Sequence, residues 1–174
     1  HAVVITLRPS GPALRPVALG LPLLSPPAEA LASGDVVAMV NGDLFDSFRQ
    51  DAAVPYSPIV TGGQIRYAPP GTARALNLSL DVPSTSRTRL RARAVFGTAA
   101  KPMATVRIAA INHYSLDHGA VLFTPEWTGR TPPGAATITI KRGRVTGIDI
   151  PGSARKPQSR EQILQIPTLE EAGA

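Results

Sequence analysis

The chain has 174 residues, of which 43% are hydrophobic and 17% are charged, and its net charge is +6. This length suits about one domain. No apolar run approaches the roughly 20 residues that a membrane-spanning helix needs. The absence of cysteine excludes disulfides, thiolate nucleophiles and cysteine-held metals. Proline (18 residues) and glycine (15 residues) are frequent, which disfavours long helices.

The basic residues are mainly arginines, since Lys101, Lys141 and Lys156 are the lysines among 18 basic positions. A guanidinium group binds two oxygens of a phosphate or carboxylate at once, so anion recognition is one explanation of this composition, and the charge alone does not choose it. Nucleic-acid-binding proteins are basic as well. Aromatic residues are 5% of the chain, however, and do not alternate with the arginines as base-stacking platforms do. We therefore expect no nucleic-acid partner, and an arginine-rich composition without anion binding is the alternative.

The N-terminal part combines apolar runs with proline. Residues 2–7 predict a strand, the proline-rich residues 9–27 predict loop or edge structure, and residues 28–33 predict a short helix. Residues 36–40 are apolar on both faces and too few for a helix, so we expect a buried central strand there. That strand ends in Asn41-Gly42-Asp43, and functional groups often lie where a buried strand opens into a loop.

Strand signals recur through the rest of the chain. Residues 137–141 and 144–150 predict a hairpin joined at Arg142-Gly143. Residues 161–164 predict a helical turn, within a polar tail or linker over 152–174. Further strands are predicted at 59–67, 73–82, 88–96 and 104–112. The expected fold class is therefore α/β (α+β): a β-rich mixed sheet with few short helices, incomplete without a following C-terminal segment.

Four arginines repeat with a period of two: Arg87, Arg89, Arg91 and Arg93. On a strand, all four side chains leave one face. Like charges in a row repel each other unless an anion or carboxylates lie opposite. The stripe is therefore either a solvated face or an anion-binding face.

A second polar segment follows the apolar strand predicted at 104–112. Asn112 and His113 lie at its end, and histidine, with an ordinary pKa near 6.5, suits acid–base work. The spacing of His113 and His118 fits no common metal-binding pattern, so we expect no metal. Hydrogen bonding within the loop is the structural alternative for this segment. A turn that satisfies its own backbone is the alternative for Asn41-Gly42-Asp43.

Three segments in this order resemble the phosphodiester glycosidase family. The first is Val40-Asn41-Gly42-Asp43-Leu44-Phe45, an apolar strand end followed by Asn-Gly-Asp. The second is the proline- and glycine-containing run at 58–65, and the third joins Ile111-Asn112 to residues 119–127 and then to the hairpin at 138–148. The chain is similar to the front half of that family's domain. Residues 1–174 are thus interpreted as the N-terminal part of one phosphodiester glycosidase-like domain.

The resemblance implies a hydrolase that cleaves a glycosidic or sugar-phosphodiester bond in a sugar-phosphate polymer or glycoconjugate. Phosphate is a good leaving group, so the reaction needs mainly a carboxylate beside the anomeric carbon and arginines on the phosphate. On this interpretation Asp43 and His113 are catalytic. The substrate-binding residues are Asn41, Gly42, Asn112, Arg89 and Arg91. No cofactor is expected, and the protein is expected to be secreted or in the cell envelope.

Two other functions remain open. The chain resembles part of a domain, so the site is expected to be completed by a missing C-terminal segment or by a second chain cut from the same precursor. In the second case the protein would be a self-processed hydrolase acting on an amide or another small substrate, with its nucleophile on that chain. From a different class, the protein would be a non-catalytic carbohydrate-binding or structural module.

Overall fold

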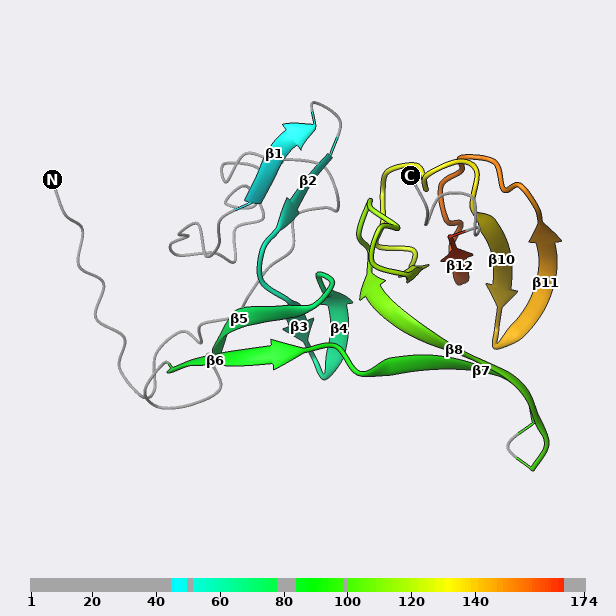
Figure 1. Cartoon of the computed structure of the whole chain (residues 1–174), viewed down its shortest axis with the longest axis horizontal. Coiled ribbons are helices and arrows are strands. Elements are labelled where there is room, and N and C mark those ends of the chain that lie inside the picture. The colour runs from blue at the N-terminus through cyan, green and yellow to red at the C-terminus, as the bar shows by residue number, and fades with distance from the viewer. Residues whose placement is uncertain (1–44, 50–51, 78–83, 99, 168–174) are drawn as a thin grey trace, which may run out of the picture.

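The structure, a computed structural model, describes residues 45–49, 52–77, 84–98 and 100–167. Its architecture is strand-rich, and no helix occurs in these residues (Figure 1). The expected β-rich mixed sheet is confirmed. Several predictions fall outside the described residues: the strands at 2–7 and 36–40, the helix at 28–33, and the residues Asn41, Gly42 and Asp43.

Six strands form the main sheet in the order β11-β10-β12-β9-β8-β7. Neighbouring strands run antiparallel except β8 and β9, which are parallel. In chain order the six strands are β7 (Ala92–Gly97), β8 (Pro102–Ile111), β9 (Ala120–Phe123), β10 (Ala136–Lys141), β11 (Arg144–Asp149) and β12 (Glu161–Ile166).

Three hairpins precede the main sheet. They are β1 (Phe45–Arg49) with β2 (Ala52–Pro55), β3 (Ile59–Thr61) with β4 (Gln64–Tyr67), and β5 (Thr72–Asn77) with β6 (Ser84–Arg89). The second confirms the strand signal at 59–67. Ala68, just after β4, exchanges backbone hydrogen bonds of 3.1 and 3.0 Å with Ile111 at the end of β8. This bridge attaches the β3–β4 hairpin to the main sheet at the point where β8 ends.

The hairpin predicted at Arg142-Gly143 is confirmed. Arg142 has a φ of 50° and Gly143 a φ of 72°, as the two central residues of a type I′ turn require. The pairing shifts after Thr139: Thr139 is opposite Gly147, whereas Ile140 is opposite Val145. Thr146 is therefore an extra residue in β11, which makes a β-bulge.

Two predictions for single elements are wrong. Residues 161–164 form the start of β12 instead of a helical turn, and β12 lies between β10 and β9 in the sheet. It is part of the segment predicted as a tail or linker. The strand predicted at 88–96 is divided, because β6 ends at Arg89 and pairs with β5, whereas β7 starts at Ala92 and pairs with β8.

Alternating side chains of the main sheet form two clusters. The first contains Val54, Tyr67, Ala110, Val121, Phe123, Trp127 and Ile163. The second contains Ala68, Ile108, Ile111, Ala120 and Leu164, with half-buried side chains such as Ile138 and Ile140 packed against it. Ile163 and Leu164 are neighbours on β12 and join different clusters, because successive strand residues point to opposite faces. The first cluster brings Val54 of β2 and Tyr67 of β4 against the sheet.

The connection between the two parallel strands positions the site. Parallel neighbours usually need a crossover of a dozen or more residues, but residues 112–119 suffice here. They suffice because β9 is short and lies beside the end of β8, with Ile108 opposite Ala120 and Ile111 opposite Leu122. The chain has to travel back only about three strand residues, or about 10 Å. The loop therefore stays at the end of β8, beside the bridge between Ala68 and Ile111.

Candidate functional site

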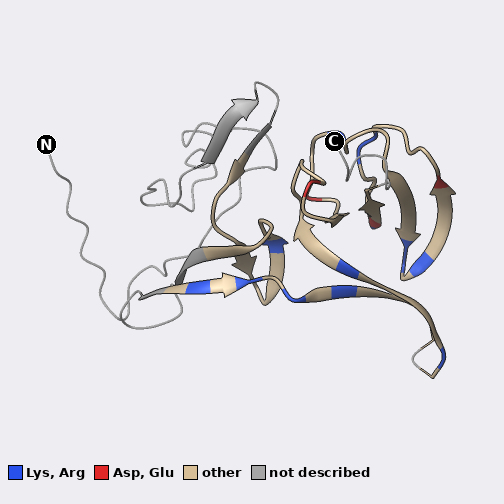
Figure 2. Ribbon diagram, in the orientation of Figure 1, with Lys and Arg blue, Asp and Glu red and all other residues tan. Residues whose placement is uncertain are grey.

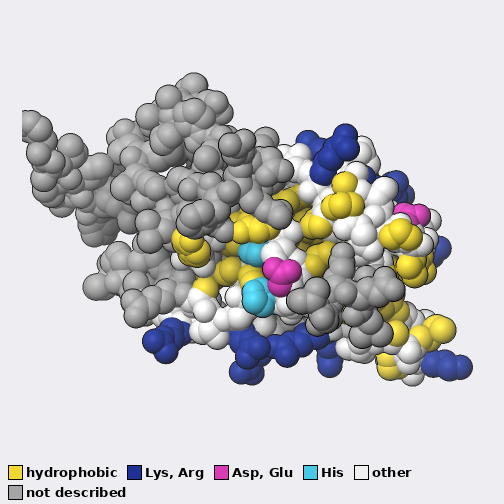
Figure 3. All heavy atoms as spheres, turned by 45° about the horizontal axis from the view of Figure 1, so that its top comes forward, with side chains coloured by type: hydrophobic (Ala, Val, Ile, Leu, Met, Phe, Trp, Pro, Cys, Tyr) yellow, Lys and Arg dark blue, Asp and Glu magenta, His cyan; other side chains and the backbone are white. Residues whose placement is uncertain are grey.

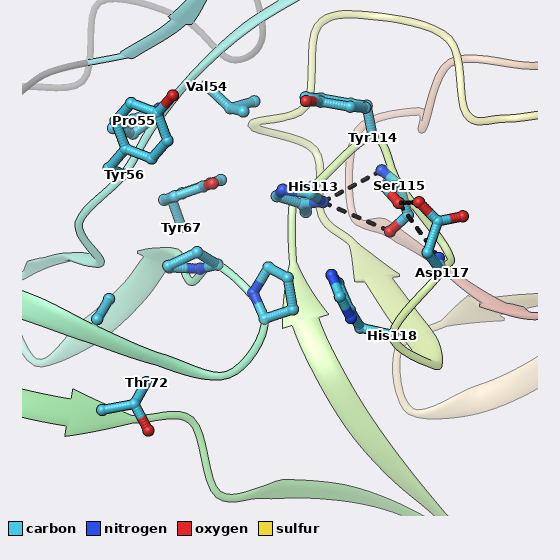
Figure 4. Close-up of a pocket in the computed structure, with 13 residues that line it drawn as sticks. Val54, Pro55, Tyr56, Tyr67, Thr72, His113, Tyr114, Ser115, Asp117 and His118 are labelled. Carbon is cyan, nitrogen blue, oxygen red and sulfur yellow. Dashed lines mark hydrogen bonds between the residues drawn. The ribbon is translucent and has the colours of Figure 1, made fainter.

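A hollow of about 570 Å³ opens where β8 ends. Its walls come from segments far apart in the sequence: the end of β2, the residues after β4, and the 112–119 loop (Figure 4). Tyr56, Tyr67 and Tyr114 give it aromatic surface, and His113 and His118 give it imidazole groups. The remaining lining residues are Val54, Pro55, Pro69, Pro70, Thr72, Ala73, Ser115 and Asp117.

His113 is buried between aromatic rings. Its ring stacks on Tyr114 at a centroid separation of 4.8 Å and an interplanar angle of 18°, and the Tyr67 ring lies 6.2 Å away. The backbone N–H of Ser115 lies 3.1 Å from His113 Nδ1, and the Ser115 carbonyl oxygen lies 3.4 Å from the same nitrogen (Figure 4). The Ser115 backbone therefore holds the ring through Nδ1 in either tautomer.

The acidic group of the loop is tied to the same turn. The Ser115 hydroxyl donates to Asp117 Oδ2 at 2.5 Å, and the Asp117 backbone N–H donates back to Ser115 Oγ at 3.2 Å (Figure 4). Asp117 and His118 are exposed. The carboxylate and the exposed imidazole therefore stand at the mouth of the hollow, whereas His113 lies within it.

Asn112, expected to bind substrate, is part of the scaffold in this structure. It is fully buried and has a φ of 54°. Its Nδ2 donates to the Arg66 carbonyl at 2.7 Å and to Thr124 Oγ1 at 2.8 Å, and its Oδ1 accepts from the Thr124 N–H at 2.8 Å. Both amide hydrogens are used, so the side chain joins the ends of β4, β8 and β9.

A second hollow, of about 380 Å³, adjoins the first. Arg89 of β6 and Arg107 of β8 line it, together with Leu90, Ile108, Ala109, Gly71 and Gly119. Pro70 and His118 line both hollows. An aromatic hollow and an arginine-lined groove therefore share one wall, which includes His118.

Sequence reasoning located some of these residues and missed others. His113 and Arg89 line the hollow and the groove, respectively, whereas Arg91 lies at the junction between β6 and β7 and is exposed. Tyr56, Tyr67 and Arg107 were not predicted. Arg107 had a signal in the sequence, because it is a charged residue inside the apolar run of β8. The two tyrosines had none, since their place depends on how distant hairpins pack.

Glu161, a carboxyl group with a lowered pKa, lines neither hollow. Glu161 is 2% exposed, and Arg155 binds its two carboxylate oxygens at 2.8 and 3.4 Å. Burial raises the pKa of Glu161. The hydrogen bonds from Arg155 and the Gln158 N–H, with the charges of Arg155 and Lys141, outweigh that effect and leave the pKa below its ordinary value of 4.5. This ion pair fixes the 152–158 segment on β10 and β12 and has no place in the site.

Two further observations concern the described residues alone. No group of three His, Cys, Asp or Glu side chains that could hold a metal ion occurs among them. No helix in the same part of the chain is long and apolar enough to cross a bilayer.

No family model, no curated protein and no solved structure matches this chain. The functional argument therefore depends on the residues and their geometry.

Proposed function

We propose that the protein is a hydrolase that cleaves a glycosidic or sugar-phosphodiester bond in a glycoconjugate. One observation carries the proposal: an aromatic hollow and an arginine-lined groove share the wall formed by Pro70 and His118. Sugar rings pack on aromatic faces, and guanidinium groups bind phosphate through two parallel hydrogen bonds. A sugar in the first hollow would thus place its phosphate near Arg89 and Arg107.

In the proposed reaction, a carboxylate either takes a proton from the water that attacks the anomeric carbon or attacks that carbon itself, and the bond from that carbon to the phosphate oxygen breaks. In the second case a glycosyl ester forms, and water then hydrolyses it to free the sugar and the carboxylate. The phosphate leaves with the bonding electrons, and the arginines stabilise its charge. His113, which lines the hollow, is proposed for acid–base work on the bound substrate. Asp43 is proposed as the carboxylate on the strength of the sequence resemblance alone.

The test is release of sugar from a chromogenic sugar 1-phosphodiester. We expect Asp43→Asn to lower kcat by at least about a hundredfold without lowering the melting temperature. Asp149→Asn, which removes an exposed carboxylate on β11, is the matched control and should retain activity. Unchanged turnover in Asp43→Asn would remove Asp43 from the reaction. Absence of sugar release from all phosphodiesters tested would contradict the hydrolase itself.

A non-catalytic carbohydrate-binding module is the second candidate. It is favoured by the hydrogen bonds within the 112–119 loop, where His113 Nδ1 and the Asp117 carboxylate are both engaged by Ser115. Such a module would bind the same phosphodiester without releasing sugar, and Tyr114→Ala would weaken binding through loss of aromatic surface. Calorimetric titration with a non-hydrolysable phosphonate analogue separates binding from turnover.

A further inference from the structure

An uncompensated row of arginines leads away from the groove. We call Arg87, Arg89, Arg91, Arg93 and Arg107 the arginine face. All five side chains are exposed, whereas Thr88, Leu90, Ala92 and Ala94 between them are half-buried. The alternation continues although the chain passes from β6 to β7, so the predicted stripe persists across two sheets. Figure 2 shows basic positions on β6, β7 and β8, and Figure 3 shows basic side chains in a row beside the histidines.

Within the described residues, the arrangement of these charges is unfavourable. Arg93 on β7 is directly opposite Arg107 on β8, and such cross-strand pairs have Cβ atoms about 5 Å apart. The ion pairs of the described part join Arg66 to Glu126 and join Lys141 and Arg155 to Glu161, so none relieves the arginine face. Repulsion between like charges costs free energy unless an anion lies between them. The row therefore suits a ligand with several negative charges.

We propose that the arginine face binds the successive phosphates of a phosphodiester-linked sugar polymer, with one repeat in the aromatic hollow. This inference rests on the proposed function and names its substrate class as a polymer. Arg89 and Arg107 line the groove and would contact the phosphate nearest the hollow. Arg87 and Arg91 flank Arg89 at a spacing of two residues, and Arg93 lies opposite Arg107. These three would contact the neighbouring phosphates, which a single-link substrate does not possess.

The test compares mannose oligomers joined by 1,6-phosphodiester links, from one to eight repeats, with neutral 1,6-linked mannose oligomers of equal length. We expect affinity to rise at least about tenfold from one link to eight, with a steeper dependence on salt for the longer oligomers. The neutral oligomers should show no such rise. Affinity that does not change with the number of phosphates would overturn the proposal.

Matched variants locate the effect. Arg87→Gln, at an exposed position of the row that lines neither hollow, should reduce the gain with length and leave binding of the single-link substrate unchanged. Arg142→Gln removes the same charge from an exposed position outside the row and should keep the gain. Equal losses in the two variants would mean that net charge alone acts, and would contradict the proposal.

Two further comparisons distinguish this proposal from nucleic-acid binding and from hydrolysis of a single-link substrate. Single-stranded DNA with eight phosphates should bind more weakly than the eight-repeat mannose phosphate, and equal or tighter binding of DNA would overturn the choice of polymer. If the single-link substrate is hydrolysed but affinity does not rise with oligomer length, the proposed hydrolase activity is supported and the polymer substrate is contradicted. Length-dependent binding without hydrolysis would support the arginine face and contradict the proposed reaction.

A separate observation concerns the edge strand β11, which is self-complementary. Within the described part, β11 pairs with β10 alone and exposes Val145 (45%) and Ile148 (61%). Because of the bulge at Thr146, Val145 and Ile148 lie opposite Ile140 and Ile138 and share one face, whereas Arg144 and Asp149 share the other. A second β11 running antiparallel to the first would therefore place an acidic residue opposite each basic one and an apolar residue opposite each apolar one.

We infer that β11 is the contact between two copies of this chain. Antiparallel pairing about a two-fold axis between Thr146 and Gly147 sets Arg144 opposite Asp149 of the second copy, and Val145 opposite Ile148. Each of these pairs occurs twice, because the two-fold axis repeats every contact. Opposite charges and apolar side chains directly across two strands stabilise their pairing.

Sedimentation equilibrium tests this contact through a charge reversal and its rescue. The unmodified protein should show a mass that rises with concentration toward two chains. Arg144→Asp should stay at the mass of one chain, and Arg144→Asp/Asp149→Arg should dimerise again because the opposite charges are restored. Arg142→Asp, next to the strand, should dimerise like the unmodified protein. A monomer at all concentrations, or a double variant as monomeric as Arg144→Asp, would overturn the inference.

Discussion

Asn112 and Thr124 bind each other reciprocally: Asn112 Nδ2 donates to Thr124 Oγ1, the Thr124 N–H donates to Asn112 Oδ1, and both distances are 2.8 Å. A further bond of 2.7 Å from Nδ2 reaches the Arg66 carbonyl. One buried amide thus holds the point where β4, β8 and β9 end. The aromatic hollow opens at this point, so its walls depend on Asn112.

We expect Asn112→Ala to lower the free energy of unfolding by about 3–4 kcal/mol, because it removes three hydrogen bonds and puts a Cβ-bearing apolar residue at a φ of 54°. Asn112→Gly loses the same bonds without that strain, so it should be more stable than Asn112→Ala by about 1 kcal/mol. Thr124→Ser, which keeps the hydroxyl, is the control. Urea unfolding measures all three, and a wild-type midpoint for Asn112→Ala would contradict this role.

The sequence predicted the elements whose local chemistry agrees with their tertiary setting. Arg142-Gly143 between two alternating apolar runs indicates a hairpin, and the apolar run ending at Asn112 indicates a strand end. Both are confirmed. β12 was missed because Glu161, Gln162 and Leu164 have helical preferences, which the pairing partners on both sides override. The Arg155 side chain also compensates the charge of the buried Glu161 carboxylate, and the local sequence pattern does not predict this ion pair.

The candidate site was harder to predict than the fold. The strand end with His113 was located correctly, but Tyr56 and Tyr67 come from hairpins that meet β8 only through the backbone bridge at Ala68. The division of the 88–96 strand was missed for a related reason. Its alternation of exposed arginines continues smoothly, while the pairing partner changes from β5 to β8. The alternation of exposed and buried side chains indicates which face of a strand is buried, but it does not indicate which strand pairs with it.

Acid should weaken the fold through Glu161. Its pKa is lowered in the folded protein, so its stabilising contribution is complete above the unfolded value near 4.5 and is lost as the pH falls through the lower folded value. Glu161→Gln should lower the free energy of unfolding by about 2–3 kcal/mol at pH 7, because it leaves Arg155 without its partner in a largely buried setting. The difference between the two proteins should shrink as the pH falls from 4.5 through the lower pKa of the folded protein.

The Arg66–Glu126 pair provides the control for this effect. Its two side chains are 34% and 35% exposed, so solvent and salt screen their attraction. Glu126→Gln should therefore cost no more than about 1 kcal/mol at pH 7. Thermal unfolding at a series of pH values compares both variants with the unmodified protein. Equal losses for the two substitutions would mean that burial of Glu161 does not strengthen its pair.

Gly152 leaves no room for a side chain. A Cβ there would lie 2.6 Å from Thr137 Cβ and 2.8 Å from the Ala135 carbonyl oxygen, and both residues are buried. Gly152→Ala should lower the free energy of unfolding by about 2–3 kcal/mol through overpacking. Gly147→Ala is the matched control, since its Cβ would meet Thr139 at 3.8 Å, an ordinary contact. Chemical denaturation should show almost no change in the free energy of unfolding for Gly147→Ala. A similar result for Gly152→Ala would contradict the predicted overpacking, because it would mean that the 152–158 segment shifts to make room for the methyl group.

At the turn between β10 and β11, a substitution can introduce backbone strain without changing side-chain packing. Gly143 has a φ of 72°, and nothing lies within 4 Å of where its Cβ would be. Gly143→Ala should therefore cost about 1–2 kcal/mol through conformation alone. Arg142→Asn should raise the free energy of unfolding by about 0.5 kcal/mol, because asparagine adopts a positive φ more easily and Asn-Gly is the preferred type I′ pair. Opposite shifts of the urea midpoint are thus expected from neighbouring substitutions, and a stabilised Gly143→Ala would mean that the hairpin does not keep its type I′ turn in solution.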